Sequence, residues 1–250
     1  MQSGKKDLKT ESLEGLKMLV SQVKAKGLSP DNRLKEYIKH FVNGGSYDTE
    51  LCAELKKRKK EGKEETSEDN EKWLHRFLHT GKGVCQQFAQ ALSLICGIDE
   101  EITCYYTAAE VKIKDETESI GHAFNVVELI NGEHSIVDIS SMIHCEEDKK
   151  GIKGGYKSDA KNFAFVSLEQ YMQNFAAEGN KVLPMLNEAT GEPYYSVSYP
   201  HYPGNEAYYD LLNLPTSDIR EGFEDLLFDP LPEQSKKVAA AVPKSGIPDR

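Results

Sequence analysis

The sequence of 250 residues has no long apolar run and no excess of positive charge. No stretch approaches the roughly 20 consecutive apolar residues that cross a bilayer, so we expect no membrane association. The 41 acidic residues outnumber the 31 basic ones, and the net charge of −10 argues against a nucleic-acid partner because backbone phosphates would be repelled. Residues 1–9 are polar and lack the apolar segment of a secretory signal.

The cysteines form no C-x-x-C pair, and their number is odd. This pattern favours neither a disulfide framework nor a zinc site, so we expect reduced thiols and a cytoplasmic protein. If a signal peptide had been removed from the chain, the protein would instead be exported or surface-exposed. Cys96 and Cys104 are predicted to be buried and not joined by a disulfide. The five cysteines are Cys52, Cys85, Cys96, Cys104 and Cys145.

The chain is long enough for one elaborated domain, and its 38% hydrophobic and 29% charged residues are typical of a globular protein. We divide it into an N-terminal helical extension packed on the core (1–70), a core with C-terminal elaboration (71–229) and a disordered tail (230–250). Helical periodicity and stop signals predict helices over residues 7–25, 31–43, 48–59, 71–78, 85–96, 167–177 and 216–229, with Asp31 and Ser167 as N-caps, Gly97 as a helix stop, a loop over 62–70 and a loop beyond Ser141.

Two smaller patterns have plain structural interpretations. His75 and His79 are four residues apart, a spacing that can place two imidazoles on one metal ion. No acidic or cysteine ligand lies at a matching offset, so we predict no metal and no cofactor. The basic residues 56–60 are followed at once by acidic ones, which indicates a solvated helix end.

The most informative stretch is residues 81–92, which read GKGVCQQFAQAL. A glycine-rich turn runs into an apolar-periodic helix that carries Cys85 in its first turn. The first N–H groups of a helix have no intrahelical partner, and the helix dipole adds positive charge there, so a thiolate is favoured. Cys85 is therefore predicted to be a nucleophile, although a lone cysteine at such a position is often only a small buried side chain.

Two further motifs follow a strand or strand pair predicted over residues 102–113. Residues 121–127 read GHAFNVV and residues 135–138 read SIVD, with Asn131-Gly132 between them. Asn-Gly between apolar segments predicts a β-hairpin. Cys85, His122 and Asp138 can then serve as nucleophile, general base and the group that orients the base.

The hairpin register decides whether this constellation can form. With a two-residue turn, Asp138 would lie opposite Asn125, which points away from the face that carries His122. One extra residue restores a common face. We therefore predict either a bulge between Val126 and Val137 or a three-residue loop, with a hydrogen bond between His122 and Asp138.

The motifs within residues 71–140 together resemble the transglutaminase-like superfamily of cysteine enzymes. The resemblance implies an α+β, papain-like fold in which the nucleophile's helix packs on an antiparallel sheet. It matches Cys85, His122 and Asp138 to the family's catalytic residues. Phe124 stands where the family usually has Trp, and we expect it to line the substrate site with Gln86. No side-chain oxyanion donor is assigned, although Gln86 and Gln87 are near the cysteine, and the Cys85 backbone N–H is the one donor argued.

The resemblance implies a cysteine-dependent amide or peptide hydrolase acting on a protein or peptide through a thioester acyl-enzyme. The alternatives are a protein-glutamine transamidase or deamidase of the same fold, and a catalytically silent peptide-binding module. Six tyrosines lie within residues 193–209. They either line a substrate site or, more simply, pack an irregular loop. The oligomeric state is left open.

Overall fold

The protein combines helices with an antiparallel sheet, as the α+β class predicts. The computed structural model describes residues 8–114, 117–149 and 159–183 and four short segments, 185–186, 193–194, 196–198 and 208–210. The helices of this part are α1 (Leu8–Lys24), α2 (Pro30–Gly44), α3 (Thr49–Lys60), α4 (Ser67–Thr80), α5 (Cys85–Asp99), α6 (Ile139–Lys149) and α7 (Leu168–Ala177), with a short 3-10 helix, η1 (Ala160–Phe163).

The main sheet has the order β11-β10-β3-β4-β5-β6, and β7 also pairs with β3. All of its pairings are antiparallel. Its strands are β3 (Thr103–Lys112), β4 (Ser119–Glu128), β5 (His134–Val137), β6 (Ala164–Val166), β7 (Lys181–Leu183), β10 (Ser196–Ser198) and β11 (Tyr208–Asp210). Two smaller pairings join β1 (Ser46–Tyr47) to β2 (Lys82–Gly83), in parallel, and β8 (Met185–Leu186) to β9 (Pro193–Tyr194).

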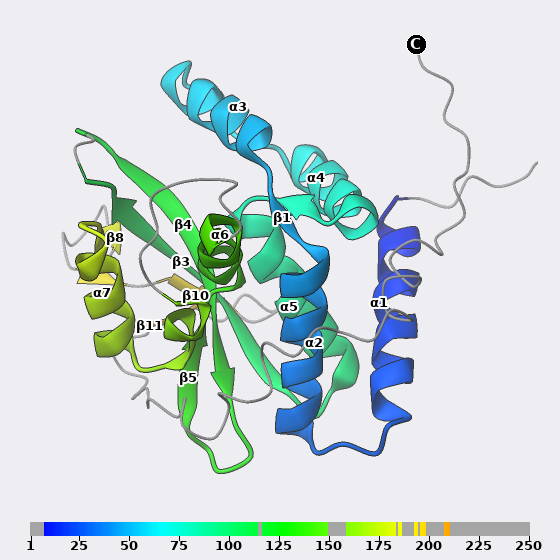
Figure 1. The fold of residues 1–250 in the computed structure, drawn as a ribbon. Coiled ribbons are helices and arrows are strands. Elements are labelled where there is room, and N and C mark those ends of the chain that lie inside the picture. Colours follow the sequence, from blue (N-terminus) through cyan, green and yellow to red (C-terminus); the bar gives the residue numbers. More distant parts are fainter. Residues whose placement is uncertain are drawn as a thin grey trace, which may run out of the picture.

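Helices cover both faces of the main sheet (Figure 1). On one face, Asn125 of β4 donates a hydrogen bond to the Ala89 carbonyl of α5 at 3.0 Å. On the other face, the Phe124 ring lies 4.8 Å from the Tyr171 ring of α7. Because neighbouring strand residues point to opposite faces, these two contacts fix α5 and α7 on opposite sides of β4. Figure 1 shows α2 and α1 beyond α5 on the same side.

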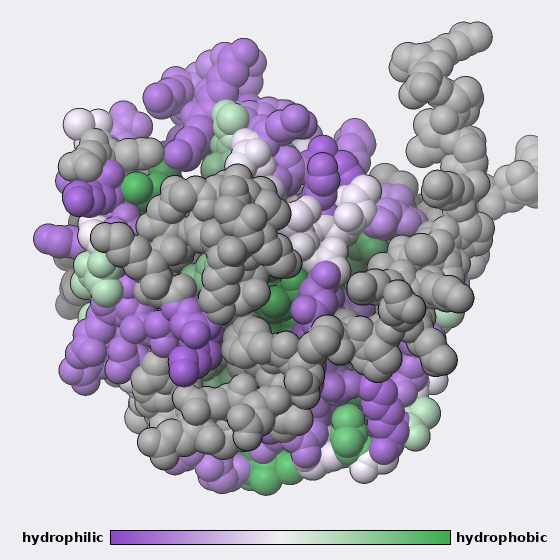
Figure 2. Space-filling model, viewed as in Figure 1, coloured by the Kyte–Doolittle hydropathy of each residue, from purple (hydrophilic) through white to green (hydrophobic). Residues whose placement is uncertain are grey.

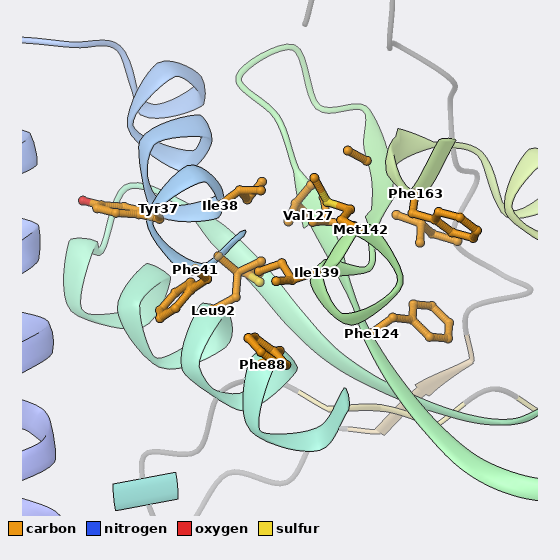
Figure 3. Close-up of a cluster of buried hydrophobic side chains, with 14 of the residues drawn as sticks. Tyr37, Ile38, Phe41, Phe88, Leu92, Phe124, Val127, Ile139, Met142 and Phe163 are labelled. Carbon is orange, nitrogen blue, oxygen red and sulfur yellow. The ribbon is translucent and has the colours of Figure 1, made fainter. Parts of the chain in front are cut away.

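The N-terminal helices share one hydrophobic core with α5 and the sheet. Tyr37 and Ile38 of α2 are fully buried, as is Leu92 of α5. Each such side chain stabilises the fold by about 1.5–3 kcal/mol through apolar burial. Figure 3 shows the cluster between the helices and the sheet; its labelled members are Tyr37, Ile38, Phe41, Phe88, Leu92, Phe124, Val127, Ile139, Met142 and Phe163.

Two helices begin earlier than predicted. Helix α4 starts at Ser67 because the Thr66 hydroxyl accepts from the Asp69 N–H at 3.1 Å and the Asp69 carboxylate accepts from the Thr66 N–H at 3.2 Å. The predicted loop over 62–70 is therefore too long. Helix α2 starts at Pro30 with Ser29 as its N-cap. The prediction of Asp31 as the N-cap is wrong.

Helix α5 does not stop at Gly97 but continues to Asp99. Its C-cap is Glu100, which adopts the left-handed conformation with φ of 64°. The reason is the buried Asp99 carboxylate, which accepts from Arg33 Nε at 2.9 Å and Nη2 at 2.8 Å and from the Tyr37 hydroxyl at 2.6 Å. These charged hydrogen bonds from α2 hold the last turn in place.

The predicted loop beyond Ser141 is wrong, because α6 runs from Ile139 to Lys149. The Asp138 carboxylate accepts from the Ser141 N–H at 3.0 Å and so acts as an N-cap. Met142 and Ile143 are buried in the core. The predicted helix 167–177 is confirmed by α7, whose N-cap hydroxyl accepts from the Gln170 N–H at 3.1 Å.

Other predictions fall on the surface or outside the described chain. The basic residues 56–60 form the end of α3, which Figure 2 shows as part of a hydrophilic surface. Within the described ranges, no helix has the length and apolar character needed to cross a membrane. The predicted helix 216–229 and tail 230–250 lie outside the described residues, as does most of the tyrosine-rich stretch apart from β9, β10 and the start of β11.

Candidate active site

The turn before Cys85 needs its glycines for close packing. Gly81 has a left-handed φ of +70°, and a Cβ there would lie 2.2 Å from the Gly44 carbonyl oxygen. A Cβ on Gly83 would lie 2.7 Å from the Phe77 ring. The chain therefore passes tightly between the end of α2 and helix α4. This packing fixes where α5 begins, and Cys85 is its first residue.

The two glutamines after Cys85 are engaged in holding this helix start. The Gln87 side-chain oxygen accepts from the Val84 N–H at 3.1 Å, and Gln87 is fully buried. The Gln86 amide donates to Asn70 of α4 at 3.2 Å. Cys85 itself is half-buried, and the N–H of a first helical residue has no acceptor within the helix.

The β4–β5 hairpin has the predicted extra residue. The Leu129 N–H donates to the Glu133 carbonyl at 2.9 Å, so the loop between the paired residues is the three-residue segment 130–132. Its last residue, Gly132, adopts a left-handed φ of +79°. The prediction of a three-residue loop is confirmed.

The register that follows from this loop brings His122 and Asp138 together. Val137 pairs with Asn125, so Asp138, one residue further on, falls on the face that carries Phe124 and His122. His122 Nε2 lies 2.8 Å from Asp138 Oδ2. The predicted hydrogen bond between these side chains is therefore confirmed.

The Asp138 carboxylate is 1% exposed and is surrounded by donors. The Tyr171 hydroxyl donates to Oδ2 at 2.8 Å and lies 3.2 Å from His122 Nε2. Ser141 donates to Oδ2 through its hydroxyl at 2.7 Å, and the Ser140 hydroxyl donates to Oδ1 at 2.7 Å. With the Ser141 N–H, both oxygens are held in one orientation. A buried charge needs such a set of partners.

The charges of this pair support each other. Burial alone would raise the pKa of Asp138, but His122 and the Ser141 hydrogen bonds hold that pKa well below its usual range. Burial alone would lower the pKa of His122, but the Asp138 charge and hydrogen bond, with a hydrogen bond to the Cys85 side chain, raise it to about 10. An imidazolium is therefore favoured at neutral pH. Nε2 faces Asp138, so Nδ1 is the ring nitrogen that remains for another partner.

Phe124 supports the histidine from within the core. It is 1% exposed, and its ring centroid lies 6.2 Å from that of His122 and 4.8 Å from that of Tyr171. A side chain this buried offers almost no surface to a substrate. The prediction that Phe124 lines the substrate site is corrected: it packs against the imidazole and helps to fix its position.

Sequence reasoning missed Tyr171 and the role of Ser141. The Ser141 contact had a local signal, because an aspartate is a favoured N-cap residue. Its carboxylate then accepts from the backbone N–H three residues later, which here is that of Ser141. Tyr171 had none, since it comes from α7, 33 residues after Asp138. Only the packing of α7 on the sheet brings its hydroxyl to the carboxylate.

The described residues do not combine into a metal site. His75 and His79 do approach each other, with their Nε2 atoms 3.0 Å apart. No group of three or more His, Cys, Asp or Glu side chains in the described part of the chain is arranged to hold a metal ion. None of the five cysteines, all of which lie in the described ranges, forms a disulfide, and Cys96 and Cys104 are buried, as predicted.

The chain matches no protein-family model and no curated protein. The case for a function therefore rests on the geometry of Cys85, His122 and Asp138.

Proposed function

We propose that this protein is a cysteine-dependent amide or peptide hydrolase of the transglutaminase-like, papain-like type. The observation that carries the proposal is the position of His122 between two partners. The Cys85 side chain is close enough to help raise the pKa of His122, and His122 Nε2 lies 2.8 Å from the buried Asp138 carboxylate. This arrangement supports the proposal because thiol catalysis needs a nucleophile, a base and a group that orients the base.

In the proposed reaction, the Cys85 thiolate attacks the carbonyl carbon of an amide. A C–S bond forms, and the carbonyl π pair moves to oxygen. The carbonyl then re-forms as the C–N bond breaks, and the His122 imidazolium gives its proton to the departing amine. His122 next accepts a proton from water, whose oxygen attacks the thioester carbon. The C–S bond then breaks, the acid departs, and the Cys85 thiolate and His122 imidazolium are restored. Asp138 keeps the imidazole oriented throughout.

The fate of the thioester defines the reaction class. Attack by water gives hydrolysis, or deamidation where the substrate is a glutamine side chain. Attack by a lysine amine gives transamidation. Water is ranked first because transamidation needs a second site that binds an amine and excludes water.

The test is a peptide-library digestion in H₂¹⁸O. The wild-type protein is incubated with peptides from a whole-cell digest, with and without an added primary amine, and the products are sequenced by mass spectrometry. We expect ¹⁸O in new carboxyl groups, either at cleaved peptide bonds or at converted glutamines. The same digestion with Cys85→Ala and with His122→Ala should give no such products.

Two results would decide against hydrolysis. Amine-modified glutamines without ¹⁸O products would assign the protein to the transamidases. No difference between the wild-type protein and Cys85→Ala with either nucleophile would indicate a silent binding module.

A further inference from the structure

One face of α5 lies directly on strands β3 and β4. Cys85, Ala89 and Ser93 are spaced by four residues and therefore share that face. The Ser93 hydroxyl lies 3.8 Å from the Cys104 sulfur of β3. The Asn125 amide of β4 donates both to the Ser93 hydroxyl at 2.9 Å and to the Ala89 carbonyl at 3.0 Å. The row of contacts runs toward the N-terminal end of the helix, where Cys85 is.

Tyr106 continues this row on the sheet. It lies two residues after Cys104 on β3, so its side chain points to the same face. It is also paired with Asn125 across β3 and β4, which places it beside the residue that touches Ala89. The next helical turn beyond Ala89 holds Cys85. Tyr106 therefore lies under the first turn of α5.

The electrostatics of Tyr106 agree with this placement. Burial raises the pKa of its hydroxyl, and the negative charge of the Cys85 side chain raises it further. The phenol therefore stays protonated over the whole physiological range and remains a hydrogen-bond donor next to the reactive sulfur. The Gln86 amide donates to Asn70, and Gln87, two residues after Cys85, points to the opposite side of the helix, where its side-chain oxygen accepts from the Val84 N–H.

We propose that the Tyr106 hydroxyl is the side-chain oxyanion donor of this site and acts together with the Cys85 backbone N–H. The inference rests on the proposed hydrolase function. When the sulfur attacks the carbonyl carbon, the carbonyl π pair becomes a negative charge on oxygen. The two donors bind that oxygen until the carbonyl re-forms and the leaving group departs. Such donors stabilise the transition state more than the bound substrate.

The test compares two reactions of Cys85 in Tyr106→Phe. Acylation by p-nitrophenyl acetate passes through an oxyanion, and the release of p-nitrophenolate measures the acylation rate. Alkylation by iodoacetamide is a displacement at carbon that forms no oxyanion. We expect acylation to fall by about 100-fold, as for the loss of one oxyanion-hole donor, and alkylation to keep its rate. The matched control is Tyr105→Phe, because Tyr105 is the preceding residue and points to the opposite face of the sheet.

Each outcome assigns a cause. Equal acylation of the wild-type protein and Tyr106→Phe would overturn the oxyanion role. A parallel loss of acylation and alkylation would overturn it too, because the hydroxyl would then act on the thiolate or on the fold. A wild-type protein that p-nitrophenyl acetate does not acylate at Cys85, as judged against Cys85→Ala, would instead refute the proposed hydrolase function.

Discussion

Replacing Asp138 with asparagine removes the charge that keeps His122 protonated, while the side chain keeps its size. In the wild-type protein, Asp138 lies 2.8 Å from His122 Nε2 and is the largest influence that opposes the effect of burial on the pKa of His122. In Asp138→Asn, burial still lowers the pKa of His122, and only the Cys85 side chain remains to raise it. We therefore expect the pKa of His122 to return toward or below the ordinary value of 6.5.

The magnitude follows from the two pKa values. The difference between about 10 and 6.5 corresponds to roughly 5 kcal/mol in favour of the imidazolium, at about 1.4 kcal/mol per pKa unit. Because the folded-state pKa is raised, this stabilisation is complete below pH 6.5 and is lost as the pH rises through the folded-state value. The substitution also leaves the Tyr171 and Ser141 donors facing an amide. Breaking such a buried pair costs about 3–5 kcal/mol of stability.

The assay is the ¹⁵N chemical shift of the histidine rings between pH 5 and pH 10. The chain has seven histidines, and a His122→Gln variant identifies the signal of His122. At pH 8 we expect an imidazolium in the wild-type protein and a neutral ring in Asp138→Asn. The control is Glu128→Gln, which removes the carboxylate 3.9 Å from His134 Nε2 at the other end of β4 and should leave His122 unchanged.

An imidazolium at pH 8 in folded Asp138→Asn would refute the reasoning, because the charge on His122 would then come from another source. The methyl signals of the same sample report whether the variant is folded.

Three further predictions concern the site and its support. Cys85→Ala and His122→Ala should each abolish an established activity, whereas Asp138→Ala should cost less because Asp138 transfers no proton; equal losses in kcat/KM for all three would contradict this ranking. Tyr171→Phe keeps the ring against Phe124 but removes one hydrogen bond to the Asp138 carboxylate, so kcat/KM should fall by about 10-fold or more, with a shifted pH profile. An unchanged pH profile would show that Tyr171 only packs against its neighbours. Asp99→Asn should lower the free energy of unfolding, measured in urea, by about 3–5 kcal/mol. The control Glu101→Gln, at an exposed side chain, should lower it by less than about 1 kcal/mol. Equally small losses in both variants would show that the Asp99 contacts do not hold α5.

The sequence predicted two parts of the site, the start of α5 and the loop between β4 and β5. The start of α5 follows from the glycine-rich turn and the apolar periodicity after it. The three-residue hairpin loop follows from requiring His122 and Asp138 on one strand face, and Gly132 supplies the positive φ that such a loop needs. These features depend on residues close together in the chain.

The features that the sequence did not reveal depend on contacts between distant segments. The extension of α5 to Asp99 follows from Arg33 and Tyr37 on α2, not from any pattern near Gly97. Tyr171 meets Asp138 only because α7 packs on the sheet. Helix α6 was missed because its sequence is largely polar, and its buried residues have partners far along the chain. Tertiary packing overrides local propensity in such segments.

The central claim is that His122 activates Cys85, and the rate of Cys85 alkylation by iodoacetamide as a function of pH tests it most directly. Cys52, which is also half-buried, provides an internal reference thiol, and peptide mass spectrometry separates the two sites. The account predicts rapid labelling of Cys85 at pH 6 in the wild-type protein and loss of that labelling in His122→Ala. It is contradicted if Cys85 is labelled only as pH rises toward about 8.5, like an ordinary thiol, with the same profile in both proteins.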